Sequence, residues 1–132
     1  MTTKSVWEIK TFLFAQYHIV CRLSEYKPND LPGYDDYRRM YAFPERNMYA
    51  DNAICKVFGK TRNCKTYEEI IQTIEDLISF FSDRSQVDED DHLSVPYIRD
   101  LLGIITTRYD YGSADVPVRF DRLVFCHARC FP

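Results

Sequence analysis

The stretch 67–82 constrains the fold of this chain more than any other part of its sequence. Thr66 and Glu69 form a capping box at its start, in which each side chain satisfies a backbone donor of the first helical turn. Apolar residues then recur every three or four positions, namely Tyr67, Ile70, Ile71, Ile74, Leu77, Ile78 and Phe81. The opposite side carries the polar residues Glu68, Gln72, Glu75 and Asp76. This spacing predicts an amphipathic helix over 67–82 with one face in a core.

The N-terminal part of the chain shows the same two signals. Ser5 and Glu8 form a second capping box, and apolar residues from Ile9 to Leu23 follow at helical spacing. We predict a helix over 6–25. Its apolar stripe is wide, so we expect this helix to lie centrally in the fold.

Prolines and glycines divide the middle of the chain. The segment from Tyr26 to Gly33 is rich in turn-forming residues and is predicted to be a loop. A short helix is predicted over 34–42, because Pro44 disfavours a helical residue in front of it. Pro44 suits the first turn of another helix, which Gly59 would end as a C-cap. The buried side of that helix would carry Met48, Ala53, Ile54, Val57 and Phe58.

The last third of the chain contains two further helix starts. Ser94 and Asp115 each stand two positions before a proline, which predicts helices over 95–109 and 116–130. The apolar side of the second helix would carry Val116, Phe120, Leu123, Val124, His127 and Phe131. Apolar and charged residues alternate around Phe120, so a short strand near the C-terminus remains an alternative.

These segments predict an all-α fold. Five or six helices joined by short loops, one of them the polar run 82–92, favour a compact orthogonal bundle in a single domain over 1–132. An α+β fold with a small C-terminal hairpin is the alternative. A chain of 132 residues with 45% hydrophobic residues is long and apolar enough to form a core without a metal or a disulfide.

The residues that could perform chemistry match no catalytic or metal-binding motif. Cys126, His127 and Cys130 supply part of a zinc ligand set, but the sequence does not place further ligands beside them. Five cysteines, an odd number, without a secretory signal favour reduced thiols and a cytoplasmic location. No apolar run approaches the roughly 18 residues of a membrane span. We therefore expect no metal, no cofactor and no membrane association.

Charge is distributed unevenly along the chain. The net charge is -3, and residues 66–100 carry ten Asp or Glu against Arg84 and Arg99, a local balance of -8. An acidic surface repels nucleic acid and attracts a basic protein. The acidic residues that we expect to face such a partner are Glu68, Glu75, Asp88 and Asp90.

Tyrosine and arginine gather in one short segment. Tyr34, Tyr37 and Tyr41 alternate there with Arg38 and Arg39. These two residue types are enriched at the energetic centres of protein interfaces. The segment is therefore a candidate partner-binding surface. Equally, the rings could simply cover the bundle with their hydroxyl groups in water.

These features together favour a small cytosolic protein-interaction module. It would be an inhibitor or immunity-type protein that masks a basic partner, with an acidic face that attracts the partner and tyrosines that anchor it. The alternative is a small enzyme, or a helical accessory domain of one, whose site is assembled from Cys, His and acidic residues distant in sequence. A deep pocket lined by His and Cys would favour the enzyme.

Overall fold

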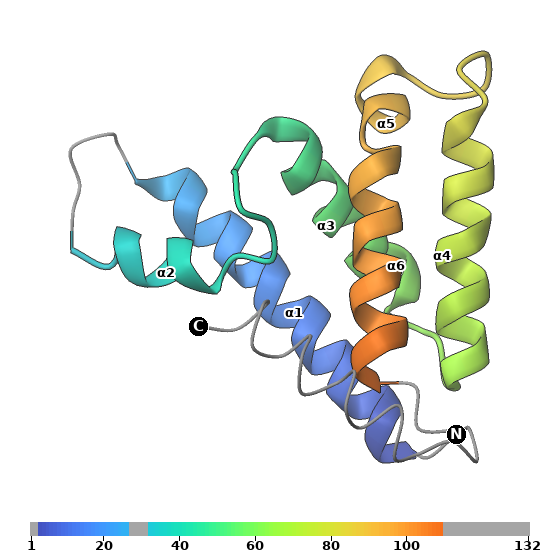
Figure 1. The fold of residues 1–132 in the computed structure, drawn as a ribbon, viewed down its shortest axis with the longest axis horizontal. Helices are drawn as coiled ribbons and strands as arrows, with labels where there is room; N and C mark the ends of the chain where they lie inside the picture. The colour runs from blue at the N-terminus through green and yellow to red at the C-terminus, as the bar shows by residue number, and fades with distance from the viewer. Residues whose placement is uncertain (1–2, 27–31, 110–132) are drawn as a thin grey trace.

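The computed structural model describes residues 3–26 and 32–109, with side chains from residue 6 onward (Figure 1). In chain order the helices are α1 (Thr3–Glu25), α2 (Tyr34–Met40), α3 (Met48–Thr61), α4 (Tyr67–Ser82), α5 (Glu89–Leu93) and α6 (Val95–Tyr109). The described residues contain no strand, so the all-α prediction is confirmed for them. The predicted helix over 116–130 and the hairpin alternative lie outside the described residues.

The helices pack into a compact bundle. α4 and α6 lie side by side and run antiparallel, and α5 forms the corner that joins them (Figure 1). α1 runs obliquely across this pair, and α3 packs against α1, α4 and α6. α2 lies along the part of α1 that ends at Glu25. The long helix α1 thus contacts α2, α3 and α6.

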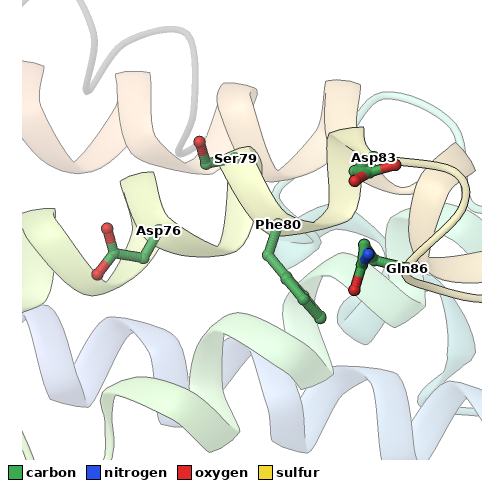
Figure 2. A pocket seen from close by; sticks show the side chains of 5 residues that line it. All are labelled: Asp76, Ser79, Phe80, Asp83 and Gln86. Carbon is green, nitrogen blue, oxygen red and sulfur yellow. The ribbon is translucent and has the colours of Figure 1, made fainter.

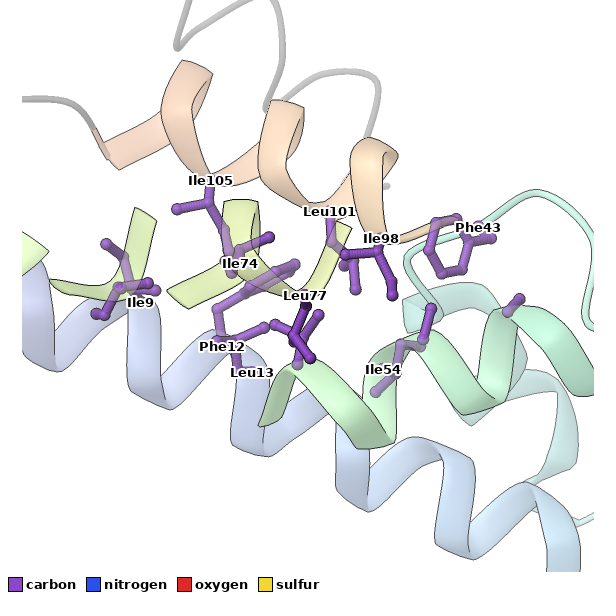
Figure 3. Packing of buried hydrophobic residues seen from close by; sticks show 14 of the residues in the cluster. Ile9, Phe12, Leu13, Phe43, Ile54, Ile74, Leu77, Ile98, Leu101 and Ile105 are labelled. Carbon is purple, nitrogen blue, oxygen red and sulfur yellow. The ribbon is translucent and has the colours of Figure 1, made fainter. Parts of the chain in front are cut away.

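The core forms where the apolar faces of α1, α3, α4 and α6 meet (Figure 3). Its fully buried side chains include Ile9, Leu13, Ile54, Ile70, Ile74, Ile98, Leu101 and Ile105. These residues come from the predicted faces of helices distant in sequence. Burying a Leu or Ile side chain stabilises a fold by roughly 1.5–3 kcal/mol, so this cluster is the main source of stability.

Helix α4 has the predicted bounds and the predicted cap. The Thr66 hydroxyl accepts a hydrogen bond from the backbone N–H of Glu69 at 3.0 Å. The Glu69 carboxylate lies 3.4 Å from that same hydroxyl, so only one half of the capping box is formed. Ile70, Ile74 and Leu77 are buried as expected.

The bounds predicted for α3 are wrong at both ends. The helix begins at Met48 because the Asn47 side chain accepts hydrogen bonds from the N–H groups of Tyr49 and Ala50, both at 2.9 Å. Asn47 is therefore the N-cap, and Pro44 lies in the preceding loop. The helix also passes through Gly59 without the positive φ of a C-cap. Contrary to prediction, Met48 is exposed.

Two other helix starts differ from the predictions. α1 begins at Thr3, so Ser5 lies inside the helix and is not its cap. The predicted loop 82–92 contains the start of α5, capped by the Asp88 side chain, which accepts from the N–H of Asp91 at 3.0 Å. A helix of five residues is too short to show a hydrophobic period, which is why the sequence pattern did not reveal it.

Candidate functional site

Exposed acidic side chains gather on α4 and around the start of α5. The helical period that places Ile70 and Ile74 in the core turns the acidic side chains of α4 outward. We define the acidic face as the exposed residues Glu68, Glu69, Glu75, Asp76, Asp83, Asp88, Glu89 and Asp90. Within the described part of the chain, Glu89 is the only member that forms an ion pair, with Arg84 at 3.4 Å. This face therefore keeps most of its negative charge uncompensated.

Phe80 interrupts the acidic face with a large apolar side chain that is 52% exposed. It lies beside a shallow pocket of about 380 Å³ that is also lined by Asp76, Ser79, Asp83 and Gln86 (Figure 2). Asp76, Phe80 and Asp83 are spaced by four and three residues, which puts them on adjacent turns of one side of the helix. Phe80 therefore lies between Asp76 and Asp83 along the helix.

Both carboxylates beside Phe80 are held in place by neighbouring side chains. The Gln72 amide donates to Oδ1 of Asp76 at 2.8 Å. Ser85 donates its hydroxyl to Oδ1 of Asp83 at 2.6 Å and its backbone N–H to the same atom at 3.1 Å. These two hydrogen bonds favour the charged form and hold the pKa of Asp83 below its usual range.

Asp88 and Asp90, predicted as partner-binding residues, lie at the α5 corner at the far end of α4 from Glu68. Both are exposed, but Asp88 is also the N-cap of α5. The backbone carbonyl of Asp90 accepts a hydrogen bond of 2.6 Å from Ser94, which ties α5 to the start of α6. A 16-residue helix is about 24 Å long, so the acidic face extends along one whole edge of the bundle.

Tyr41 does not lie on the surface. It is only 4% exposed, and its hydroxyl donates to the Asp51 carboxylate at 2.6 Å. Burial, together with this hydrogen bond to Asp51, raises the pKa of Tyr41. Asp51 also pairs with Arg46 at 2.9 Å, so the three side chains join the loop before α3 to α3 itself. We therefore assign Tyr41 to the core and not to a binding surface.

Tyr34 and Tyr37 are half-buried in an aromatic cluster between α1 and α2. The Tyr26 ring packs against both, with centroids 5.8 Å from Tyr34 and 6.4 Å from Tyr37. His18 and Arg22 of α1 also contact Tyr37, at 6.0 Å and 5.7 Å from its ring centroid. Much of each ring is thus used to hold α2 on α1.

The two arginines of this segment differ in role. Arg38 donates to the backbone carbonyls of Phe43 and Pro44, so it holds the loop that follows α2. Arg39 is exposed and pairs with Asp36 one turn earlier. Of the five Tyr and Arg residues that we predicted to contact a partner, only Arg39 is exposed.

The acidic face and the tyrosine segment do not form one surface. Figure 1 places α2 and α4 at opposite ends of the longest axis of the molecule, with α1, α3 and α6 between them. A partner that contacts α4 would have to span the bundle to reach Tyr34 or Tyr37. Phe80 is the aromatic residue that accompanies the acidic face. The sequence analysis missed Phe80. The signal that could have identified it is that Phe80 falls outside the series of apolar residues that recur every three or four positions along α4.

The described residues also include the titratable side chains of His18, His92 and Cys55. His18 of α1 packs against the Tyr37 ring of α2. His92 lies elsewhere, with its Nδ1 atom 3.0 Å from the backbone carbonyl oxygen of Phe81. Burial raises the pKa of the Cys55 thiol, which disfavours the reactive thiolate. Within the described ranges no three His, Cys, Asp or Glu side chains are grouped as metal ligands. Cys126, His127 and Cys130 lie outside those ranges.

Three of the surface pockets along the described helices are lined by neither His nor Cys. None of the helices in residues 3–26 and 32–109 is long and apolar enough to cross a membrane. Comparisons with known protein families, with curated proteins and with solved structures found no match.

Proposed function

We propose that this chain is a small cytosolic protein-binding module, of the inhibitor or immunity type, that masks a basic surface of another protein with its acidic face. The observation that carries the proposal is Phe80, a half-exposed ring that lines one pocket together with Asp76 and Asp83, whose carboxylates are hydrogen-bonded by Gln72 and Ser85. A large aromatic side chain surrounded by polar groups is the usual composition of an interface centre.

The two parts of this surface would contribute differently to binding. The acidic side chains would attract a basic partner over distance and raise the association rate. Phe80 would be desolvated in the complex and would slow dissociation. Because Gln72 and Ser85 already orient the flanking carboxylates, less side-chain entropy is lost when the partner binds.

The tyrosine segment has a different role in this proposal. Tyr41 supports the core, and Tyr34 and Tyr37 hold α2 on α1. Phe80 takes the place of the tyrosines as the aromatic anchor. The role of attracting a basic partner stays with the acidic residues predicted for it, namely Glu68, Glu75, Asp88 and Asp90.

A capture experiment with matched phenylalanine variants tests the proposal. The full chain would be immobilised and exposed to native lysate, in parallel with Phe80→Ala and Phe14→Ala. Phe14 is a suitable control because it is exposed to a similar degree but lies on α1. We expect a basic protein that is captured by the parent and by Phe14→Ala and lost with Phe80→Ala. Loss of the same protein from both variants, or capture that does not depend on Phe80, would refute the proposal.

A further inference from the structure

A small pocket lies between α1 and α3, two helices that pack against each other. Its volume is about 200 Å³. Three lining residues come from α1 and three from α3 and its C-cap, namely Lys10, Leu13, Phe14, Phe58, Thr61 and Arg62. The pocket therefore combines two cations with two aromatic rings, at a place that the proposed function does not use.

The aromatic wall of the pocket is held in place by a neighbouring ring. Tyr17 stacks on Phe58 with the ring centroids 4.6 Å apart and an angle of 19° between the rings. Phe14 packs against Phe58 at a centroid distance of 6.0 Å, yet 57% of Phe14 remains exposed. Stacked and tilted contacts are the arrangements that aromatic rings prefer. A further ring would therefore extend this cluster and remove Phe14 from water.

The most buried part of the pocket suits a hydrocarbon. Leu13 and Thr61 are only 0% and 1% exposed. The Thr61 hydroxyl already donates to the carbonyl oxygen of Val57 at 2.7 Å. A ring that contacts these two side chains would thus leave no hydroxyl donor unpaired.

Two positive charges stand beside the aromatic wall. Nζ of Lys10 donates to the backbone carbonyl of Arg62 at 2.9 Å, and the Arg62 guanidinium lies 5.5 Å from the centroid of the Phe58 ring. Among the side chains that the structure describes, neither cation forms an ion pair with a carboxylate. Both keep N–H donors for a ligand, because an ammonium has three and a guanidinium five. The carbonyl end of α3 carries about half a negative charge, which two full positive charges exceed.

We propose that this pocket binds a small aromatic acid, a single ring that carries a carboxylate or a phosphate. The ring would pack on Phe14 and Phe58 above Leu13. The anionic group would accept charge-assisted hydrogen bonds from Lys10 and Arg62. Charge complementarity selects an acid over a neutral ring, and the exposed aromatic wall selects a ring over a simple anion.

The volume of the pocket limits the ligand to one ring. A cavity of about 150 Å³ holds a benzene molecule, so about 200 Å³ leaves room for a small acidic group beside the ring. Sites for larger, drug-sized ligands begin at roughly 300 Å³. The ligand that fits is therefore smaller than a nucleotide.

This inference does not depend on the proposed function. The pocket lies on α1 and α3, whereas the acidic face lies on α4 and around the start of α5. Two uncompensated cations repel a basic protein, so the capture of such a protein should not involve Phe14. Either proposal can fail while the other holds.

An NMR titration of the full chain with four small probes tests the inference. Phenyl phosphate and benzoate carry both a ring and a negative charge, whereas inorganic phosphate lacks the ring and benzyl alcohol lacks the charge. For a probe of about 11 heavy atoms we expect a dissociation constant in the millimolar range, which amide chemical shifts can detect. The two aromatic acids should give saturable shifts at the amides of residues 10–14 and 58–62. Inorganic phosphate and benzyl alcohol should bind about tenfold more weakly or not at all.

Matched variants separate the contributions of charge and ring. The double variant Lys10→Gln with Arg62→Gln should raise the dissociation constant of phenyl phosphate about fivefold or more. Lys60→Gln, which removes an exposed charge from the same helix α3, should leave it nearly unchanged. Phe14→Ala should weaken the binding of both acids, whereas Phe80→Ala, at a ring exposed to a similar degree on α4, should not. Unchanged amide signals of residues 67–78 would show that each variant remains folded.

Several results would overturn the inference. Equal binding of phenyl phosphate and benzyl alcohol would show that the cations contribute nothing, and equal binding of inorganic phosphate would show the same of the rings. Shifts that persist unchanged in the double variant would place the probe elsewhere. Signals of residues 10–14 that move on dilution of the parent without a probe, but not in Phe80→Ala, would identify a second copy of the chain as the occupant.

Discussion

Helix α4 and the tyrosine segment, residues 34–41, both contain aromatic and charged residues, but the exposure of these side chains follows a helical period only on α4. On α4 a regular period separates Ile74 from Glu75, so that one faces the core and the other faces solvent. In the tyrosine segment no period continues long enough to assign each ring. The exposure of Tyr41 is decided by Asp51 on α3, a contact that the local sequence does not contain.

The comparison teaches that periodicity identifies a surface only where an element is long and regular. The end of the tyrosine segment is held by Gln16 of α1, which is buried. Its amide donates to the carbonyl of Met40 at 3.0 Å, and its side-chain oxygen accepts from the N–H of Ala42 at 2.9 Å. Such contacts between segments distant in sequence convert apparent surface residues into structural ones.

The largest expected effect tests the core side of α4. Ile74→Ala should lower the free energy of unfolding by about 2–5 kcal/mol, because Ile74 is fully buried and its removal leaves a cavity. Ile71→Ala, at a half-buried position on the same helix, should cost less. Denaturant midpoints of the two variants and the parent give the comparison. Equal midpoints for all three would contradict the assignment of faces on α4.

Tyr41→Phe tests the structural role of the tyrosine segment. The variant keeps the ring but removes the hydroxyl that donates to Asp51, so we expect a loss of about 1–3 kcal/mol in stability. Tyr34→Phe, at a half-buried ring on α2, should have a smaller effect. Thermal unfolding of both variants would decide, and a stable Tyr41→Phe together with a destabilised Tyr34→Phe would reverse our assignment.

The dependence of stability on alkaline pH also tests whether Tyr41 is a buried structural residue. The pKa of Tyr41 is raised in the folded protein, mainly by burial, above its unfolded value of about 10. The folded state therefore holds the hydroxyl proton of Tyr41 more tightly than the unfolded state does. The stability that protonated Tyr41 contributes is fully present below pH about 10 and decreases as the pH rises above about 10. The parent should lose stability more steeply than Tyr41→Phe above that pH. Parallel curves of unfolding free energy against pH would show that Tyr41 titrates normally.

The smallest effect concerns the carboxylate beside Phe80. Ser85→Ala removes one of the two hydrogen bonds that lower the pKa of Asp83, so this pKa should rise toward its usual value. A group with a lowered pKa stabilises the fold above its unfolded pKa and loses that effect as pH falls. Since Asp83 is exposed, we expect little change in overall stability. The carboxyl chemical shift of Asp83, followed by NMR as pH falls, is the measurement, and an unchanged titration would show that Ser85 does not orient Asp83.

Sequence reasoning predicted the fold class from caps and helical periodicity, as Thr66 and Ile74 illustrate, and it predicted the acidic face from the local charge of residues 66–100. It failed where a cap or a contact is supplied by an unexpected residue. Asn47 begins α3 in place of Pro44, and the five-residue helix α5 has no period to detect. Phe80 was visible in the sequence as an aromatic residue outside the apolar stripe. The orientation of the nearby Asp76 and Asp83 carboxylates depends on Gln72 and Ser85, which no pattern predicts.

The central claim is that the acidic face and Phe80 bind a basic protein together, and that the tyrosine segment does not. Four neutral substitutions remove charge from the face: Glu68→Gln, Glu75→Gln, Asp88→Asn and Asp90→Asn. Asn is as good an N-cap as Asp, so α5 should be retained. Tyr37→Ala is the control from the tyrosine segment.

Surface plasmon resonance against the protein captured through Phe80, at low and high salt, is the most direct test. The charge-neutralised protein should associate more slowly than the parent at low salt, and high salt should remove the difference because exposed charges are screened over about 8 Å at physiological ionic strength. Phe80→Ala should dissociate faster at both salt concentrations, and Tyr37→Ala should match the parent. Equal association rates for the parent and the neutralised protein at low salt, or faster dissociation of Tyr37→Ala than of Phe80→Ala, would contradict the account.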